Sequence, residues 1–152
     1  MFRRFAHGAF KWGWPAAWSV SLFARLKEPE QAGLMVKESC RSLGANLMTE
    51  QHLQLDCAFG LGAAVAEMLL QSHDGSIELL PAVPGSWAEG RVGGLRARGG
   101  FEVSFQWRLG TVTRCEVRST LGGPCRIHGP GLRSVELSTD PGKIYQVPVR
   151  EE

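Results

Sequence analysis

The stretch that decides the fold is "LQLDCAFGLGAAVAEMLLQSHDG", residues 53–75, because the character of the chain changes at its end. Before residue 74, apolar residues recur with helical spacing. After it, short runs are separated by glycine and proline, which is typical of strands. The stretch itself predicts a helix from about residue 57 to 73. That helix is apolar almost all round and is therefore expected to be buried.

Two further helices are predicted before this one. The first begins near Pro15, a residue that suits a helix start, and extends to about residue 26. The second begins near Pro29 and ends at Gly44, with its apolar residues on one face. Together they form an αα-hairpin. Three helices with such faces cannot bury all their apolar surface on one another.

The second half of the chain predicts β-structure. Residues 101–108, "FEVSFQWR", alternate between apolar and polar, and residues 112–119 form the returning strand of a hairpin. Shorter strands are predicted at 76–80, 125–128, 133–138 and 144–149. The glycines of "RVGGLRARGGF", residues 91–101, predict turns and a bulge. The fold class is therefore α+β.

Composition and charge exclude several classes of protein. The chain has 152 residues, 43% of them hydrophobic, which fits one globular domain or one and a half small ones. A net charge of +2 is too small to favour nucleic acid or an anionic membrane as a partner. No run reaches the roughly 20 apolar residues of a membrane span. Lys11, Pro15 and Ser19 interrupt the first apolar segment, which favours an amphipathic helix over a signal peptide and leaves the compartment undecided.

The four cysteines, at positions 40, 57, 115 and 125, do not predict a metal site. No pair has CxxC spacing, and no histidine lies at a zinc-finger interval from them. A disulfide between Cys115 and Cys125 across a hairpin stays open, although two buried thiols are favoured. No metal or cofactor is predicted.

Asp56 is the first candidate for a chemical role. One interpretation is an N-cap that accepts backbone N–H groups of the helix. The other is a functional carboxylate held at the helix start. Glu67, the next acid along the helix, lies roughly 16 Å away along the axis. That is too far for the carboxylate pair of a glycosidase, so Glu67 is expected to be a structural acid in an ion pair.

Two histidines and several tryptophans are weaker candidates. His52 and His73 flank the same predicted helix, and no serine or cysteine nucleophile motif accompanies either one. His52 is retained as a substrate-binding candidate in case its loop lines a pocket. Tryptophans are frequent platforms for sugars, but those at the start of the first helix are expected to lie in the core.

Two segments carry a family resemblance. Residues 54–107 contain "QLDCAFG", "AEMLLQSH", "LLPAVP" and "GLRARGGFEV" in the order found in the C-terminal region of glycoside hydrolase family 95, the inverting α-L-fucosidases. Residues 13–26, "GWPAAWSVSLFARL", resemble an earlier helix of that family. The likeness extends from about residue 13 to 120, and these long ungapped matches make it specific.

The resemblance implies an architecture and a function. Residues 1–74 would be the last helices of an (α/α)6 catalytic toroid, and residues 75–152 a small antiparallel, sandwich-like β-domain. The full enzyme would hydrolyse terminal α-L-fucosyl linkages of a fucosylated oligosaccharide or glycan with inversion. In this family the aspartate of the Q-x-D motif, here Asp56, polarises two asparagine amides that hold the attacking water.

The sequence also departs from the family pattern. Cys57 and Ala58 stand where the family has glycine and asparagine, and the segment around His52 is one residue shorter. The family's general acid and asparagine pair lie upstream of the matched region. The chain alone is therefore expected to be inactive, with the upstream toroid segment as a possible partner. The alternatives are a non-catalytic carbohydrate-binding module and an interaction fragment.

Overall fold

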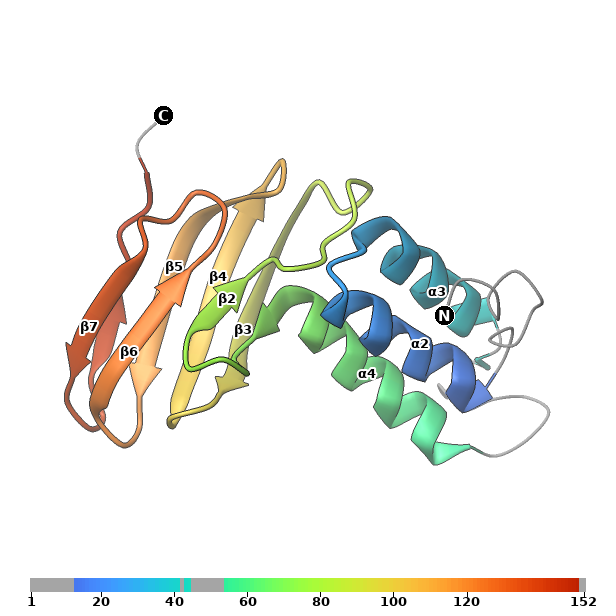
Figure 1. The fold of residues 1–152 in the computed structure, drawn as a ribbon, viewed down its shortest axis with the longest axis horizontal. Helices are drawn as coiled ribbons and strands as arrows, with labels where there is room; N and C mark the ends of the chain where they lie inside the picture. Colours follow the sequence, from blue (N-terminus) through green and yellow to red (C-terminus); the bar gives the residue numbers. More distant parts are fainter. Residues whose placement is uncertain (1–12, 42, 45–53, 151–152) are drawn as a thin grey trace. The chain divides into compact units, whose positions relative to one another are not determined.

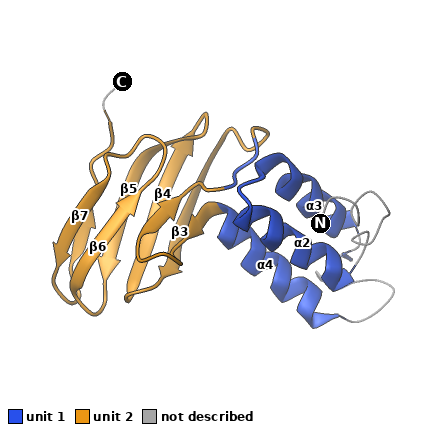
Figure 2. Ribbon diagram, in the orientation of Figure 1, with its two compact units in different colours: residues 1–68, 82–84 blue, residues 69–81, 85–152 orange. Residues whose placement is uncertain are grey.

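The computed structural model of the chain describes residues 13–41, 43–44 and 54–150, in which helices precede strands (Figure 1). The helices are α2 (Gly13–Arg25), α3 (Pro29–Arg41) and α4 (Leu55–Leu69). The chain forms two compact units (Figure 2). The helical unit comprises residues 1–68 and 82–84, and the β-unit comprises residues 69–81 and 85–152. The predicted α+β class is confirmed.

The helical unit contains the predicted αα-hairpin. Small side chains let α2 pack closely, since Ala16, Val20 and Ala24 are fully buried together with Phe23. The chain then turns at Lys27, which has a φ of 56°. In α3, Ala32 and Met35 are buried, and in α4, Ala64 and Met68.

Helix α4 differs from the prediction in length and in burial. It ends at Leu69, and the next two residues form strand β1 (Leu70–Gln71) instead of a last helical turn. One face of α4 is exposed: Phe59 is 71% exposed and Leu55 48%. The expectation of a helix buried all round is wrong for this face, because no described element of the helical unit covers it.

The tryptophans of α2 are also exposed. Trp14 is 48% exposed and Trp18 51%, and their ring centroids lie 6.1 Å apart. The expectation that they lie in the core is wrong for the described residues. Their rings cover one another only in part, so an apolar surface remains at the start of this helix.

The β-unit consists of two four-stranded sheets (Figure 1). One has the order β1-β2-β6-β7, with β2 (Ile77–Leu79), β6 (Gly123–His128) and β7 (Val135–Thr139). The other has the order β3-β4-β5-β8, with β3 (Glu89–Ala97), β4 (Phe101–Arg108), β5 (Thr111–Ser119) and β8 (Ile144–Gln146). The prediction of an antiparallel domain needs one correction, because β2 pairs with β6 in parallel. The three strands β3, β4 and β5 intervene between these two along the chain.

The alternation of apolar and polar residues along β4 places the core of the β-unit on the predicted face of this strand. In β4, Phe101, Val103, Phe105 and Trp107 are all buried. The inward residues of β5 and β6 pack in the same core, with Val117 and Ile127 almost inaccessible. Strand β3 was not predicted, because its three glycines interrupt the alternation of apolar and polar residues, but the bulge was predicted. The register shifts between Val92 and Leu95.

Candidate functional site

Asp56 lies in the first turn of α4, on the surface of the helical unit. Its Oδ1 accepts the backbone N–H of the next residue, Cys57, at 3.1 Å. An N-cap would precede the helix and accept an N–H group two or three residues further on. The N-cap interpretation is therefore wrong, since Asp56 is the second residue of the helix and the residue before the helix is Gln54. The acid still lies at the helix end whose partial positive charge favours a carboxylate.

Gln54 connects the starts of two helices. Its Oε1 accepts the backbone N–H of Trp14 at 3.0 Å, across 40 residues of sequence. Gly13 makes room for this bond, because a Cβ at that position would overlap Oε1, and its φ of 65° also favours glycine. Gln54 was part of the quoted motif, but no role was predicted for it.

Glu67 is a structural acid, as predicted. Its carboxylate receives the Arg25 guanidinium through two contacts, Nε at 2.7 Å and Nη2 at 3.3 Å. This bidentate pair joins the last residue of α2 to the last turns of α4. Glu67 is therefore not a second carboxylate facing Asp56.

The cysteines are free thiols. Burial, and secondarily the Asp56 carboxylate, raises the pKa of the Cys57 thiol. In the β-unit, burial raises the pKa of Cys125 to about 11, and burial together with Cys125 and Glu116 raises the pKa of Cys115 to about 12. The two β-unit cysteines are thus the buried thiols that the sequence favoured. None of the three is activated as a nucleophile, because a nucleophilic cysteine has a lowered pKa.

The remaining candidates contribute less to the site. His52 lies outside the described residues. His73 is exposed in the β-unit. In the described part of the chain, no group of three or more histidine, cysteine, aspartate or glutamate side chains is arranged to hold a metal ion. No helix among these residues is long and apolar enough to cross a membrane.

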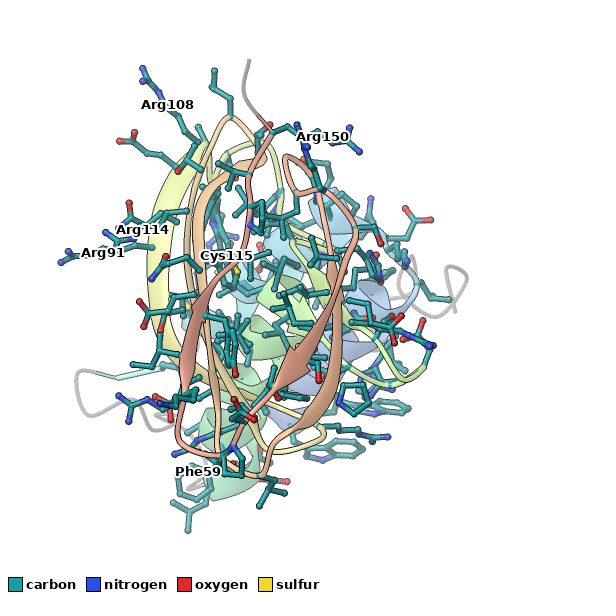
Figure 3. All side chains as sticks on the ribbon, turned by 90° about the vertical axis from the view of Figure 1, so that its left-hand side faces the viewer. Phe59, Arg91, Arg108, Arg114, Cys115 and Arg150 are labelled. Atoms are coloured by element: carbon teal, nitrogen blue, oxygen red, sulfur yellow. The ribbon has the colours of Figure 1, made fainter. Side chains whose placement is uncertain are left out.

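The geometry allows Asp56 to act on a group outside the described residues. One carboxylate oxygen is oriented by the Cys57 N–H, and the residue is exposed. Phe59, one turn further along α4, is exposed as well (Figure 3). A fixed, accessible carboxylate can accept a hydrogen bond from an amide or a water molecule and polarise it.

Comparison with protein families divides the chain at the end of α4. Residues 3–69 match the glycosyl hydrolase family 95 catalytic domain. Residues 71–151 match the glycoside hydrolase family 95 C-terminal domain. Asp56 lies in the part that matches the catalytic domain.

Curated relatives are similar along most of this chain. Alpha-L-fucosidase 2 of Arabidopsis thaliana is 37% identical over 147 residues, which cover 88% of this chain and 17% of the plant protein. Probable alpha-fucosidase A of Aspergillus niger is 32% identical over 148 residues, which cover 84% of this chain and 19% of the fungal protein. The chain thus spans less than one fifth of the length of these relatives.

Proposed function

Because this chain belongs to glycoside hydrolase family 95, we propose that it is the C-terminal part of an α-L-fucosidase. The helical unit would complete an (α/α)6 catalytic toroid, and the β-unit would be the domain that follows it. The full enzyme would hydrolyse terminal α-L-fucosyl linkages of an oligosaccharide or glycan. Support comes from the matches to both family domains in order, and from the relatives named as fucosidases.

The proposed mechanism is inversion, in which water attacks the anomeric carbon from the face opposite the departing oxygen. Asp56 would act as part of the base by polarising amide groups that hold this water. The observation that carries this role is an exposed carboxylate, oriented by the Cys57 N–H, within the part that matches the catalytic domain. His52 would contact the sugar. The general acid would come from another part of the enzyme, since Glu67 is paired with Arg25.

The exposed apolar side chains of the helical unit support a docking partner. Trp14, Trp18, Leu55 and Phe59 are each between 48% and 71% exposed. Large apolar side chains that lie together at a surface, as the Trp14 and Trp18 rings do, mark an interaction site, whereas singly exposed ones do not. We assign this surface to the upstream toroid segment, because the relatives contain more than four fifths of their length outside the matched region. The chain alone would then be inactive.

A chimera tests the proposal. Residues 13–150 of this chain would replace the matching region of the Arabidopsis thaliana relative, and fucose release from a terminal α-L-fucosyl oligosaccharide would be measured. We expect the chimera to release fucose. The fucose first formed should have the inverted anomeric configuration, that is, β from an α-linked substrate. The Asp56→Asn chimera should lose about 100-fold or more in rate, as is typical when a positioned acid–base group is removed.

Two results would contradict parts of the proposal. An Asp56→Asn chimera that melts cooperatively and keeps its full rate would remove Asp56 from the mechanism. Fucose release by the isolated chain, above that of its own Asp56→Asn variant, would show that no upstream acid is needed. A circular dichroism melt of every variant separates lost chemistry from lost folding.

A further inference from the structure

A polar groove lies on the outer face of the β3-β4-β5-β8 sheet, wholly within the β-unit. Its volume is about 400 Å³, toward the lower end of the range of small-molecule sites. The buried residues of β4 face the other way, into the core. The polar side chains that line the groove are Arg91, Ser104, Gln106, Arg114 and Glu116.

The strand register places two arginines on either side of one amide. Arg91 pairs with Gln106, and Gln106 pairs with Arg114 on the next strand. Since adjacent strands lie about 4.8 Å apart, the two arginine backbones are separated by about 10 Å. Figure 3 shows Arg91 and Arg114 projecting from the same side of the sheet. A planar ligand above Gln106 can therefore be reached by both guanidinium groups.

Two bulges lie next to these arginines. In β3, Gly93 and Gly94 together oppose the single residue Ser104. In β5, Thr113 is the extra residue beside Arg114. Bulges change the direction of neighbouring side chains and are frequent beside binding sites. The Gly94 N–H donates to the Ser104 Oγ at 3.1 Å, so the Ser104 hydroxyl hydrogen is available to a ligand.

Arg91 and Arg114, the two arginines of the groove, form no ion pair with an acid of the described residues. Elsewhere in the β-unit, Arg96 pairs with Glu102 at 3.2 Å and Arg126 with Glu136 at the same distance. Among the ion pairs that the described residues form, none includes Arg91 or Arg114. The carboxylate in the groove, that of Glu116, accepts a hydrogen bond from Gln146 at 2.8 Å. The groove thus presents two guanidinium groups and one carboxylate that is already engaged.

We propose that this groove binds a uronate residue, a sugar acid, within an acidic glycan. A guanidinium group matches a carboxylate with two parallel hydrogen bonds. Ser104, Gln106 and Glu116 offer the hydroxyl, amide and carboxylate groups that bind sugar hydroxyls. Glu116 and the small net charge of +2 disfavour nucleic acid and other polyanions. The proposal that the ligand is a saccharide rests on the proposed glycosidase function. The proposal that this saccharide carries a carboxylate rests on the two arginines of the groove.

Titration of the whole chain tests this site. The ligand is a galacturonate trisaccharide, and its methyl ester serves as an uncharged control of the same shape. We expect the acid to bind at least about tenfold more tightly than the ester, because each charge-assisted hydrogen bond contributes strongly. Amide chemical-shift changes should centre on Gly94, Ser104 and Gln106.

Variants identify the residues responsible. Arg91→Gln and Arg114→Gln should each weaken binding by about tenfold. Arg114→Lys should weaken it nearly as much, because lysine keeps the charge but loses the bidentate geometry. Arg118→Gln, also exposed on β5, is the matched control and should leave binding unchanged.

Three outcomes would overturn the proposal. These are equal affinity for the acid and its ester, equal loss in Arg118→Gln and Arg114→Gln, and equally tight binding of tripolyphosphate at the same amides. Failure here is distinguishable from failure of the proposed function. The chimera assay measures fucose release from an uncharged substrate and does not depend on the groove.

Discussion

The two units differ in what they leave exposed. In the β-unit, apolar side chains point inward from both sheets, and the outer face of β4 and β5 carries mostly arginine, glutamate, glutamine and serine. Its large exposed apolar residues, Leu109, Leu121 and Ile144, are scattered over turns and an edge strand. In the helical unit, large apolar side chains are exposed along helix faces. The β-unit contains its own core, whereas the helical unit presents large apolar side chains at its surface, where we propose that the upstream toroid segment packs.

The largest expected effect comes from placing a charge in the core of the β-unit. Val117 is fully buried, so Val117→Asp should lower the free energy of unfolding by more than about 4 kcal/mol. Urea denaturation followed by tryptophan fluorescence measures this. The control is the neighbouring exposed residue, where Arg118→Gln should change stability by less than about 0.5 kcal/mol. Equal effects of the two substitutions would mean that the β-unit has no core of its own.

The second effect is a loss of stability of the β-unit at alkaline pH, caused by its two buried thiols. The folded state raises the pKa of Cys125 to about 11 and that of Cys115 to about 12, whereas an unfolded thiol titrates near 9.0. Above pH 9 the unfolded state loses protons that the folded state keeps, so stability is fully present below pH 9 and falls as pH rises. The slope is about 1.4 kcal/mol per pH unit for each thiol.

Urea denaturation under reducing conditions at several pH values between 8 and 11 measures this slope. The double variant Cys115→Ala and Cys125→Ala is the control, because the other titrating groups remain. Its stability should fall less steeply above pH 9. Parallel curves for the variant and the unmodified chain would refute the assignment.

A smaller effect is expected at the start of the helical unit. Gln54→Leu removes the acceptor of the Trp14 N–H and should cost about 1 kcal/mol. Gln54→Glu retains an acceptor oxygen and should recover most of the loss. The helical signal at 222 nm and hydrogen exchange at the Trp14 amide report the change. Equal exchange rates in the two variants would show that this bond does not join the helices.

The smallest effect on the isolated chain is expected at the exposed face of α4. Phe59 is 71% exposed, so Phe59→Asp should change the free energy of unfolding by less than about 0.5 kcal/mol. In the fucosidase chimera the same substitution should abolish activity, because it would place a charge in the proposed interface. A loss of stability in the isolated chain as large as that of Val117→Asp would show that the face is already covered.

The spacing of apolar residues predicted those helices and strands whose apolar faces pack against other elements of the same unit. The αα-hairpin and the alternation of β4 follow from the period of their apolar residues alone. Strand β3 could not be predicted, because its glycines carry no pattern and its pairing with β4 stabilises it. The end of α4 was missed for a similar reason, since Leu70 pairs with Leu79 of β2.

The candidate site was predicted in part. The sequence singled out Asp56 and assigned Glu67 to an ion pair, which the Arg25 contact confirms. The role of Gln54 depends on a hydrogen bond across 40 residues, which no local pattern reveals. The pair formed by Arg91 and Arg114 depends on register across three strands, and register is set by the fold rather than by spacing.

The short segment Ala82–Pro84 has a consequence for how such chains can be recombined. It belongs to the helical unit, although the residues on both sides of it belong to the β-unit. A Cβ on Gly33 would lie 2.9 Å from the Pro84 ring, so a larger residue at position 33 requires the segment around Pro84 to shift or change. Exchanging β-domains between homologous enzymes at a single junction after α4 would bring in a foreign segment here. A successful domain swap must therefore transfer residues 82–84 with their helical partner, or leave both behind.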